Sequence, residues 1–155
     1  MVGGLREFGH QGIEFLAGRQ VGQRSVCEEL ETRLSTVLRV PVRLTVTGTL
    51  DDLPAGVGLG VYRIVQESIA NATRHAQGAA ITVALTLDTG TLNLSIENGP
   101  RTSDADLGGP GLGQGIPGMA ERARTVGGSL SATPTAGGGF AVRAALPARP
   151  DGATA

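Results

Sequence analysis

Aromatic residues are scarce in this sequence: they make up 3% of it, and tryptophan is absent. A hydrophobic core must therefore be built from valine, leucine, isoleucine and alanine, within an apolar fraction of 40%. The single cysteine, Cys27, excludes an internal disulfide and a cysteine-rich zinc site, and it fits a reducing compartment. There is no run of about 18 apolar residues and no signal-peptide pattern. We therefore expect a soluble, cytoplasmic chain without direct membrane contact, and a membrane anchor on a longer parent protein stays open.

Net charge is also small, at −1 over 155 residues. A chain of this length is typical of one ordinary domain. Nearly balanced charge gives no global attraction to nucleic acid or to a membrane surface, so any anion site has to be built locally. Glycine, by contrast, is abundant at 25 residues, and about half of them follow residue 90, which predicts functional loops there.

The spacing of apolar residues predicts the order of helices and strands. Apolar residues at helical spacing predict a helix within 20–40 that Pro41 ends, and two further helices over 61–76 and 116–126. Alternation predicts strands over 42–47, 79–87, 91–96, 129–133 and 140–146, with a tight hairpin at 88–91. Because hairpins dominate, we expect a mixed, mostly antiparallel sheet with helices on one face, a two-layer α/β sandwich. The expected organisation is a helical N-terminal segment (1–40), one domain (41–147) and a frayed tail (148–155).

The stretch V61-Y-R-I-V-Q-E-S-I-A-N-A-T-R-H-A76 carries the first of three polar groupings. At about 100° per residue, its apolar residues share one broad side of a helix. The other side is a narrow polar stripe, formed by Arg63, Glu67, Asn71 and Arg74. Spacings of three and four residues make a carboxylate, a carboxamide and cations neighbours. A solvated face is the usual explanation of such a stripe, so its meaning depends on the other two groupings.

The second grouping is the strand end Ile96-Glu97-Asn98-Gly99-Pro100, and the third is the glycine-rich G108-G-P-G-L-G-Q-G-I-P-G-M119 before a predicted helix. Glycines let backbone N–H groups approach an anion closely, and a helix N-terminus adds its dipole. The third grouping is not a Walker loop, because no G-K-[ST] follows. It lacks the strand–glycine–helix unit of a Rossmann turn as well.

In this order the three groupings resemble the ATP-binding catalytic domain of bacterial sensor histidine kinases, in the superfamily shared with gyrase and the MutL repair proteins. The nitrate-sensor-like subgroup is the most similar. The stretch 62–76 is similar to its N box, G113-Q-G-I-P-G-M-A-E-R-A123 to its second glycine box, and 126–128 and 137–147 to its closing strands. The resemblance covers about residues 40–147 and implies the histidine kinase-like ATPase fold.

The N-box resemblance implies roles for the polar stripe. Asn71 matches the asparagine that coordinates Mg²⁺ through its amide oxygen, a ligand type that a hard cation prefers. Glu67 matches the catalytic acidic residue that polarises the attacking group or a metal-bound water. Arg74 and His75 match basic positions near the phosphates of ATP, although a structural role at the helix end is an equal alternative for His75.

The glycine-box resemblance implies the remaining contacts. Gly113 and Gly115 match the glycines that close over the phosphates. Strand parity aligns Asn98 with the aspartate that accepts a hydrogen bond from the adenine amino group, and a shift of one residue would align Glu97 instead. An asparagine oxygen can accept this bond, but without charge assistance. Phe140 stands where many relatives have threonine, which removes a hydroxyl contact.

The resemblance implies a histidine protein kinase domain that uses ATP and Mg²⁺. It would donate the γ-phosphoryl group to a histidine on a separate phosphoacceptor and dimerisation domain. The phosphoryl group would then pass to a response regulator. R6-E-F-G-H10 is only faintly similar to a phosphoacceptor motif, so His10 is interpreted as a surface histidine. The helix within 20–40 can cover the sheet, pack on a partner or form a homodimer.

The first glycine box of the family has the pattern Asp-x-Gly-x-Gly, whereas here Asn98 stands at the Asp position and Gly99, Pro100 and Thr102 do not align with the glycines. This departure favours an alternative of another class, a nucleotide-gated regulatory module with weak or no kinase activity. A serine kinase of the anti-sigma-factor type is a third hypothesis, and the N box argues against it.

Overall fold

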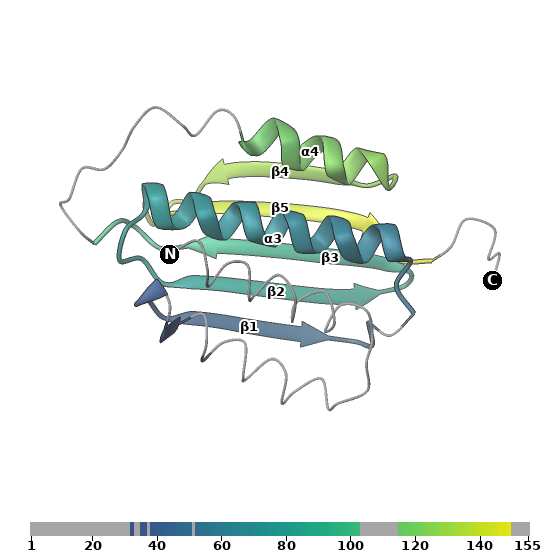
Figure 1. Ribbon diagram of the computed structural model, residues 1–155, viewed down its shortest axis with the longest axis horizontal. Coiled ribbons are helices and arrows are strands. Elements are labelled where there is room, and N and C mark those ends of the chain that lie inside the picture. The colour runs from purple at the N-terminus through teal and green to yellow at the C-terminus, as the bar shows by residue number, and fades with distance from the viewer. Residues whose placement is uncertain (1–31, 33–34, 37, 51, 103–114, 150–155) are drawn as a thin grey trace.

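The computed structural model describes residues 32, 35–36, 38–50, 52–102 and 115–149. Within them the chain forms two long helices and five strands. Their bounds are β1 Val42–Thr47, α3 Ala55–His75, β2 Ile81–Asp88, β3 Thr91–Asn98, α4 Gly115–Thr125, β4 Ser129–Pro134 and β5 Phe140–Pro147 (Figure 1). The predicted order of strands and helices is confirmed for this part of the chain.

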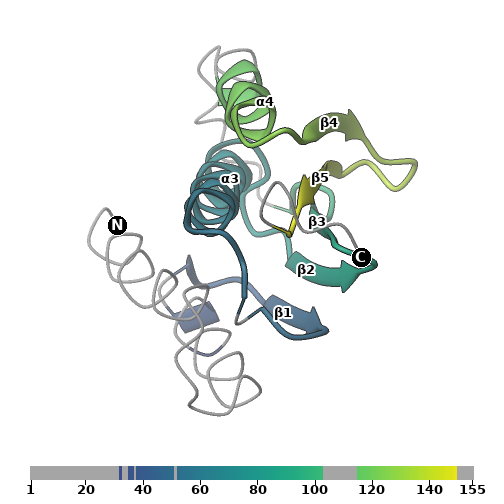
Figure 2. The ribbon, with the colours of Figure 1, turned by 90° about the vertical axis from the view of Figure 1, so that its right-hand side faces the viewer.

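The strands form one sheet in the order β1-β2-β3-β5-β4. The β1–β2 pair is parallel, because α3 connects these strands, and the other three pairs are antiparallel. Seen from the side, α3 and α4 lie on the same face of the sheet (Figure 2). The predicted two-layer sandwich with a mixed sheet is therefore confirmed.

The start of α3 departs from the stretch singled out in the sequence, which began at residue 61. The helix begins at Ala55 and includes Gly56, Gly58 and Gly60, although each glycine costs about 1 kcal/mol relative to alanine. The Pro54 carbonyl accepts hydrogen bonds from the amides of residues 57 and 58, at 2.9 and 3.0 Å. Val57 is buried, 4% exposed, so packing on the sheet offsets the low helix propensity of this segment.

The core lies between the helices and the sheet. Its largest fully buried side chains come from both layers: Leu50, Ile64, Ile69, Ile81, Leu92, Leu94, Met119, Leu146, Val61 and Val83. The opposite face of the sheet carries exposed polar side chains, such as Thr45, Thr82 and Asn93. This alternation explains how a core almost free of aromatic residues forms, since β-branched and leucine side chains fill one face of β1, β2 and β3.

Two turns place the strand ends. Thr89 and Gly90 both have positive φ, 45° and 83°, as a two-residue hairpin between β2 and β3 requires. The β4–β5 hairpin closes through the Thr135 amide, which donates to the Gly139 carbonyl at 3.0 Å. β3 is longer than predicted and continues to Asn98, which pairs with Phe140 of β5. These registers bring the end of β3 and the start of β5 together.

Several predictions fall outside the described residues: most of the N-terminal helix, His10, Cys27, Gly113 and the end of the tail. Residues 32, 35, 36 and 38 are helical, as predicted, and the Ser35 hydroxyl accepts a hydrogen bond from the Val42 amide at 3.0 Å. Among the described residues, no helix has the length and apolar character needed to span a membrane.

Leu92 and Leu59 offer a matched test of this core, since Leu92 is 0% exposed and Leu59 is 50% exposed. We expect Leu92→Ala to lower the free energy of unfolding by about 2–5 kcal/mol, because it removes buried methyl groups and leaves a cavity. Leu59→Ala should cost less than about 1 kcal/mol. Urea denaturation of both variants measures this, and equal losses would contradict the assigned core.

Candidate functional site

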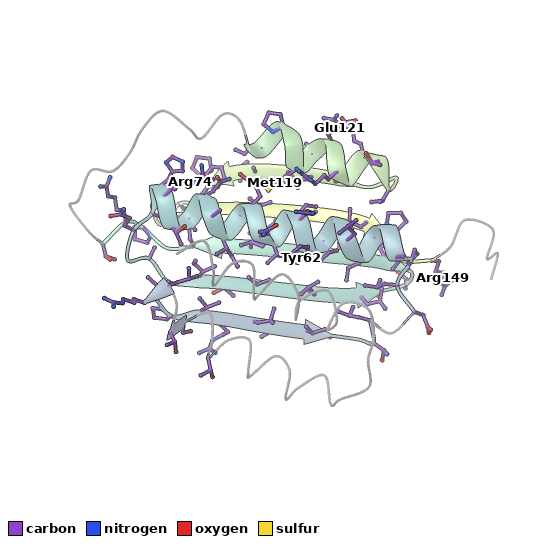
Figure 3. The ribbon with its side chains drawn as sticks, viewed as in Figure 1. Tyr62, Arg74, Met119, Glu121 and Arg149 are labelled. Atoms are coloured by element: carbon purple, nitrogen blue, oxygen red, sulfur yellow. The ribbon has the colours of Figure 1, made fainter. Side chains whose placement is uncertain are left out.

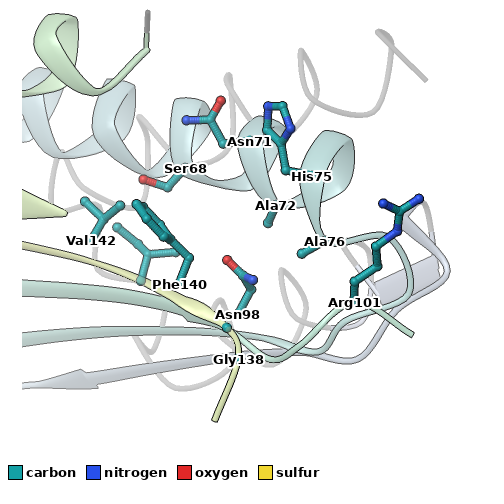
Figure 4. A pocket seen from close by; sticks show the side chains of 12 residues that line it. Ser68, Asn71, Ala72, His75, Ala76, Asn98, Arg101, Gly138, Phe140 and Val142 are labelled. Carbon is teal, nitrogen blue, oxygen red and sulfur yellow. The ribbon is translucent and has the colours of Figure 1, made fainter. Parts of the chain in front are cut away.

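A pocket opens between the C-terminal half of α3, the end of β3 and the start of β5 (Figure 4). The space between these elements amounts to about 660 Å³, and this figure includes space open to solvent. Apolar side chains of both layers line it, together with five polar ones: Ser68, Asn71, His75, Asn98 and Arg101. The pocket therefore combines apolar walls with a few polar side chains.

Asn98 forms part of the sheet side of this pocket. Its side chain rises from the end of β3 toward α3 (Figure 4). The Asn98 Nδ2 donates to the Gly99 carbonyl at 2.9 Å, and the Gly99 amide in turn donates to the Ala80 carbonyl at 3.0 Å. These bonds orient the amide so that its Oδ1 remains the group available as an acceptor.

Glu97 points to the other face of the sheet. It is exposed, and its Oε2 lies 3.6 Å from the Arg143 Nη2 of β5. The two residues next to each other in sequence thus lie on opposite faces, as strand alternation requires. Asn98, not Glu97, lines the pocket, and contact with a base stays a prediction.

Gly139 and Phe140 shape the strand-end side of the pocket. A Cβ at Gly139 would overlap the Asn98 carbonyl oxygen, so only glycine permits this approach of β5 to β3. Phe140 follows it and forms part of the pocket lining in Figure 4. The substitution noted in the sequence therefore adds an apolar wall to the pocket.

The N-terminus of α4 lies against the polar stripe of α3. A Cβ built on Gly115, the first residue of α4, would lie 2.5 Å from the Glu67 Oε1 and 3.2 Å from the Asn71 Nδ2. A helix N-terminus presents unpaired N–H groups and a partial positive charge. The first and third groupings of the sequence are therefore in contact, at the rim of the pocket that the second one lines.

Arg74 contacts the other polar residues of the stripe, whereas Arg63 makes its contacts elsewhere. The Arg74 Nη2 lies 3.4 Å from the Asn71 Oδ1 and 3.6 Å from the Glu67 Oε1. Arg63, one turn before Glu67, instead donates to the Gln66 Oε1 at 3.5 Å and lies over the Tyr62 ring. Figure 3 shows Arg74 at the end of α3 near the start of α4, with Tyr62 farther back along the helix.

His75 lines the pocket, and its Nε2 is buried without a hydrogen-bond partner in the described part of the chain. Leaving a buried polar atom unpaired costs about 1–3 kcal/mol, so a polar group on a ligand would relieve that cost. This observation favours the binding role of His75 over the structural alternative, without testing it.

Residues 56–150 match the family of histidine kinase-, DNA gyrase B- and HSP90-like ATPases. The chain belongs to this ATPase family. Over 95 residues it is 33% identical to the sensor histidine kinase YxjM of Bacillus subtilis strain 168, which covers 61% of this chain and 22% of that protein. The chain thus spans less than a quarter of this relative, and the match leaves the nitrate-sensor-like subgroup open.

Solved structures share the fold of this ATPase domain. The histidine kinase domain of the blue-light activated histidine kinase of Erythrobacter litoralis EL346 aligns with a TM-score of 0.57 and 18% identity, over 80% of this chain and 64% of that one. The catalytic domain of the histidine kinase ThkA aligns with a TM-score of 0.58 and 13% identity, over 89% and 94%. Identities this low support the fold alone.

The oxygens of Asn71 and Glu67 suit a magnesium ion held together with phosphates. The described residues contain no group of three or more His, Cys, Asp or Glu side chains able to hold a metal. Mg²⁺ needs no such cage, since it commonly takes one or two protein oxygens and completes its shell with phosphate oxygens and water. Gly115 can lie this close to both side chains because it has no Cβ.

The sequence interpretation missed Ser68 and Arg101 as pocket residues. Ser68 is buried, and its hydroxyl donates to the Met119 Sδ at 3.4 Å, so it also joins α3 to α4 in the core. Arg101 reaches the pocket because the Thr102 amide donates to the Gln77 carbonyl at 3.1 Å and holds the loop beside α3. No local pattern in the sequence predicts this contact between distant segments.

Gly139→Ala tests the close approach of β5 to β3. The new methyl group would overlap the Asn98 carbonyl, a backbone atom that cannot rotate away, so we expect a loss of at least about 1–3 kcal/mol in unfolding free energy. Gly137→Ala is the control, because a Cβ there has nothing within 4 Å. Denaturant unfolding gives both values, and a Gly139→Ala variant as stable as the control would contradict the strand register.

Proposed function

We propose that this chain binds Mg-ATP and is the catalytic domain of a two-component sensor histidine kinase of the nitrate-sensor-like subgroup. It donates the γ-phosphoryl group to a histidine on a separate acceptor domain, and the phosphoryl group then passes to a response regulator. The observation that carries the proposal is the contact of Gly115 with Glu67 and Asn71 at the rim of the pocket that Asn98 lines. Membership of the ATPase family supports it.

The apolar part of the pocket takes the adenine base. Ala72, Ile96 and Val142 supply flat apolar contact, and Asn98 Oδ1 accepts a hydrogen bond from the adenine amino group. Because Asn98 Nδ2 already donates to the Gly99 carbonyl, its oxygen is the atom left for the base. A neutral amide lacks the charge assistance of a carboxylate, so this bond contributes less than its counterpart in relatives with aspartate.

The rim takes the phosphates. ATP brings roughly four negative charges, which favour the N-terminus of α4, Arg74 and His75 as neighbours. Gly113, outside the described residues, and Gly115 let the backbone approach the phosphate oxygens closely. Asn71 Oδ1, with Glu67 nearby, would hold a magnesium ion, and a bound ion would supply positive charge against the phosphates.

Glu67 is the proposed catalytic residue. In the transfer, a bond forms between a ring nitrogen of the acceptor histidine and the γ-phosphorus, and the bond to the β–γ bridging oxygen breaks, leaving ADP. The Glu67 carboxylate orients the incoming imidazole and accepts the proton that its nitrogen loses. Its side chain is 36% exposed, so an acceptor domain can reach it.

The domain boundaries predicted from the sequence complete the proposal. Residues 41–147 form the ATPase domain, the helical segment 1–40 packs on a partner, forms a homodimer contact or covers the sheet, and 148–155 are a tail. The acceptor domain and the response regulator are partners that a sensor kinase requires, and the name of the relative YxjM supports this assignment.

Asn71→Ala is expected to abolish the magnesium dependence of nucleotide binding, because it removes the proposed metal ligand. Calorimetric titration of ATP with and without Mg²⁺ measures this as a loss of at least about tenfold in affinity. Asn93→Ala, an exposed asparagine on the outer face of β3, is the matched control and should bind as the wild type does. A wild type that binds no ATP at millimolar nucleotide would contradict the proposal itself.

Gly115→Ala is expected to separate stability from function. The new Cβ meets the tip of the flexible Glu67 side chain, which can rotate away, so the unfolding free energy should change by less than about 1 kcal/mol. The displaced carboxylate should nevertheless lower phosphoryl transfer about tenfold or more. Gly118→Ala is the control, since its Cβ meets only the Arg122 guanidinium, at 3.2 Å. Equal phosphoryl-transfer rates for the two variants would contradict the proposed catalytic role of Glu67.

One observation favours a second candidate, a nucleotide-gated regulatory module with weak or no kinase activity. Asn98 replaces the acid expected at the base, and residues 99–102 read Gly-Pro-Arg-Thr. Incubating the chain with Mg-ATP and a separate acceptor domain distinguishes the two. Acid-labile phosphate on the acceptor histidine supports the kinase, and tight nucleotide binding without transfer supports the module.

A further inference from the structure

Arg74 contacts the proposed metal ligand, Asn71, and the neighbouring carboxylate of Glu67 at the same time. Its Nη2 lies 3.4 Å from the Asn71 Oδ1 and 3.6 Å from the Glu67 Oε1, while its Nε donates to the Ala70 carbonyl at 3.3 Å. The bond to Ala70 fixes the guanidinium to its own helix and aims it along the stripe. A permanent positive charge therefore sits beside the two side chains that a divalent cation would need.

The geometry points to Arg74 as the residue that makes the site select a metal–nucleotide complex over a free divalent cation. This inference rests on the proposed function. A free cation has to approach Asn71 and Glu67 against the charge of Arg74 and has to displace its contacts. Mg-ATP carries a net negative charge, and its phosphate oxygens offer the guanidinium a bidentate partner in exchange.

The exposure of these side chains makes the contact reversible. Arg74 is 57% exposed and Glu67 is 36% exposed, so water screens the ion pair and holds it weakly. A weak ion pair suits this role, because it lowers the affinity for a free divalent cation by a modest factor. The phosphates of a nucleotide can still replace the contacts that Arg74 makes. A deeply buried pair would exclude both.

Arg63 provides a control on the same helix. It is also an arginine within one turn of Glu67, but its guanidinium donates to the Gln66 Oε1 and lies 5.8 Å from the centre of the Tyr62 ring. Removing Arg63 changes the net charge by the same amount as removing Arg74. A difference between the two variants therefore reports the contact with Asn71 and Glu67 and not the overall charge.

The test measures Mn²⁺ binding to the whole chain without nucleotide, by electron paramagnetic resonance, for the wild type, Arg74→Gln and Arg63→Gln. We expect Arg74→Gln to bind Mn²⁺ at least about threefold more tightly than the wild type, the size that a screened surface pair supports. Arg63→Gln should match the wild type. Equal Mn²⁺ affinity of the wild type and Arg74→Gln, or the same gain in Arg63→Gln, would overturn the inference.

For Mg-ATP, the same substitution should change the affinity in the opposite direction. Calorimetry should show Mg-ATP binding about tenfold more weakly to Arg74→Gln than to the wild type, because the phosphates lose a cationic partner. A purely structural role for Arg74 would weaken both ligands together, and melting temperatures identify that outcome, which also overturns the inference. A wild type that binds no Mg-ATP contradicts the proposed function, whereas unchanged Mn²⁺ binding in Arg74→Gln contradicts only the selective role of Arg74.

Discussion

The fold and the position of the candidate site both depend on the packing of one side of α3 against the mixed sheet. Val61, Ile64 and Ile69 are 0% exposed there, and burying each such side chain stabilises the fold by about 1.5–3 kcal/mol. A helix held along one side has to leave its other side at the surface. Because its C-terminal half ends where β3 ends and β5 begins, polar residues of α3 lie beside strand ends and α4 there while remaining partly exposed (Figure 1).

Polarity is graded across the resulting site. Near the sheet, the pocket has apolar walls and the neutral amide of Asn98, while its rim carries Glu67, Arg74 and the N-terminus of α4. A neutral base with a charged phosphate chain matches this gradient. Backbone proximity maintains it, since Gly139 lets two strand ends meet and Gly115 lets a helix end lie over a carboxylate.

Local spacing in the sequence was sufficient to predict the order of elements, the mixed sheet and the side of α3 that is buried. Period-2 and period-3.6 patterns depend only on the geometry of a single strand or helix, so they can be read without knowing what packs nearby. The hairpin turn at Thr89-Gly90 was predictable for the same reason. Element ends were not, because the start of α3 and the last residues of β3 form through burial and pairing with distant segments.

The sequence by itself determined which side chains share a face. It placed Glu67, Asn71 and Arg74 on the polar side of α3, and it placed Asn98 and Glu97 on opposite faces of β3. Only the tertiary structure decided which faces meet. It separated Arg63 from Arg74, although both lie in the same stripe, and it brought Gly115 to Glu67 and Arg101 to the pocket. The reason is physical: contacts between residues far apart in the chain depend on strand register and helix packing, which the whole core sets together.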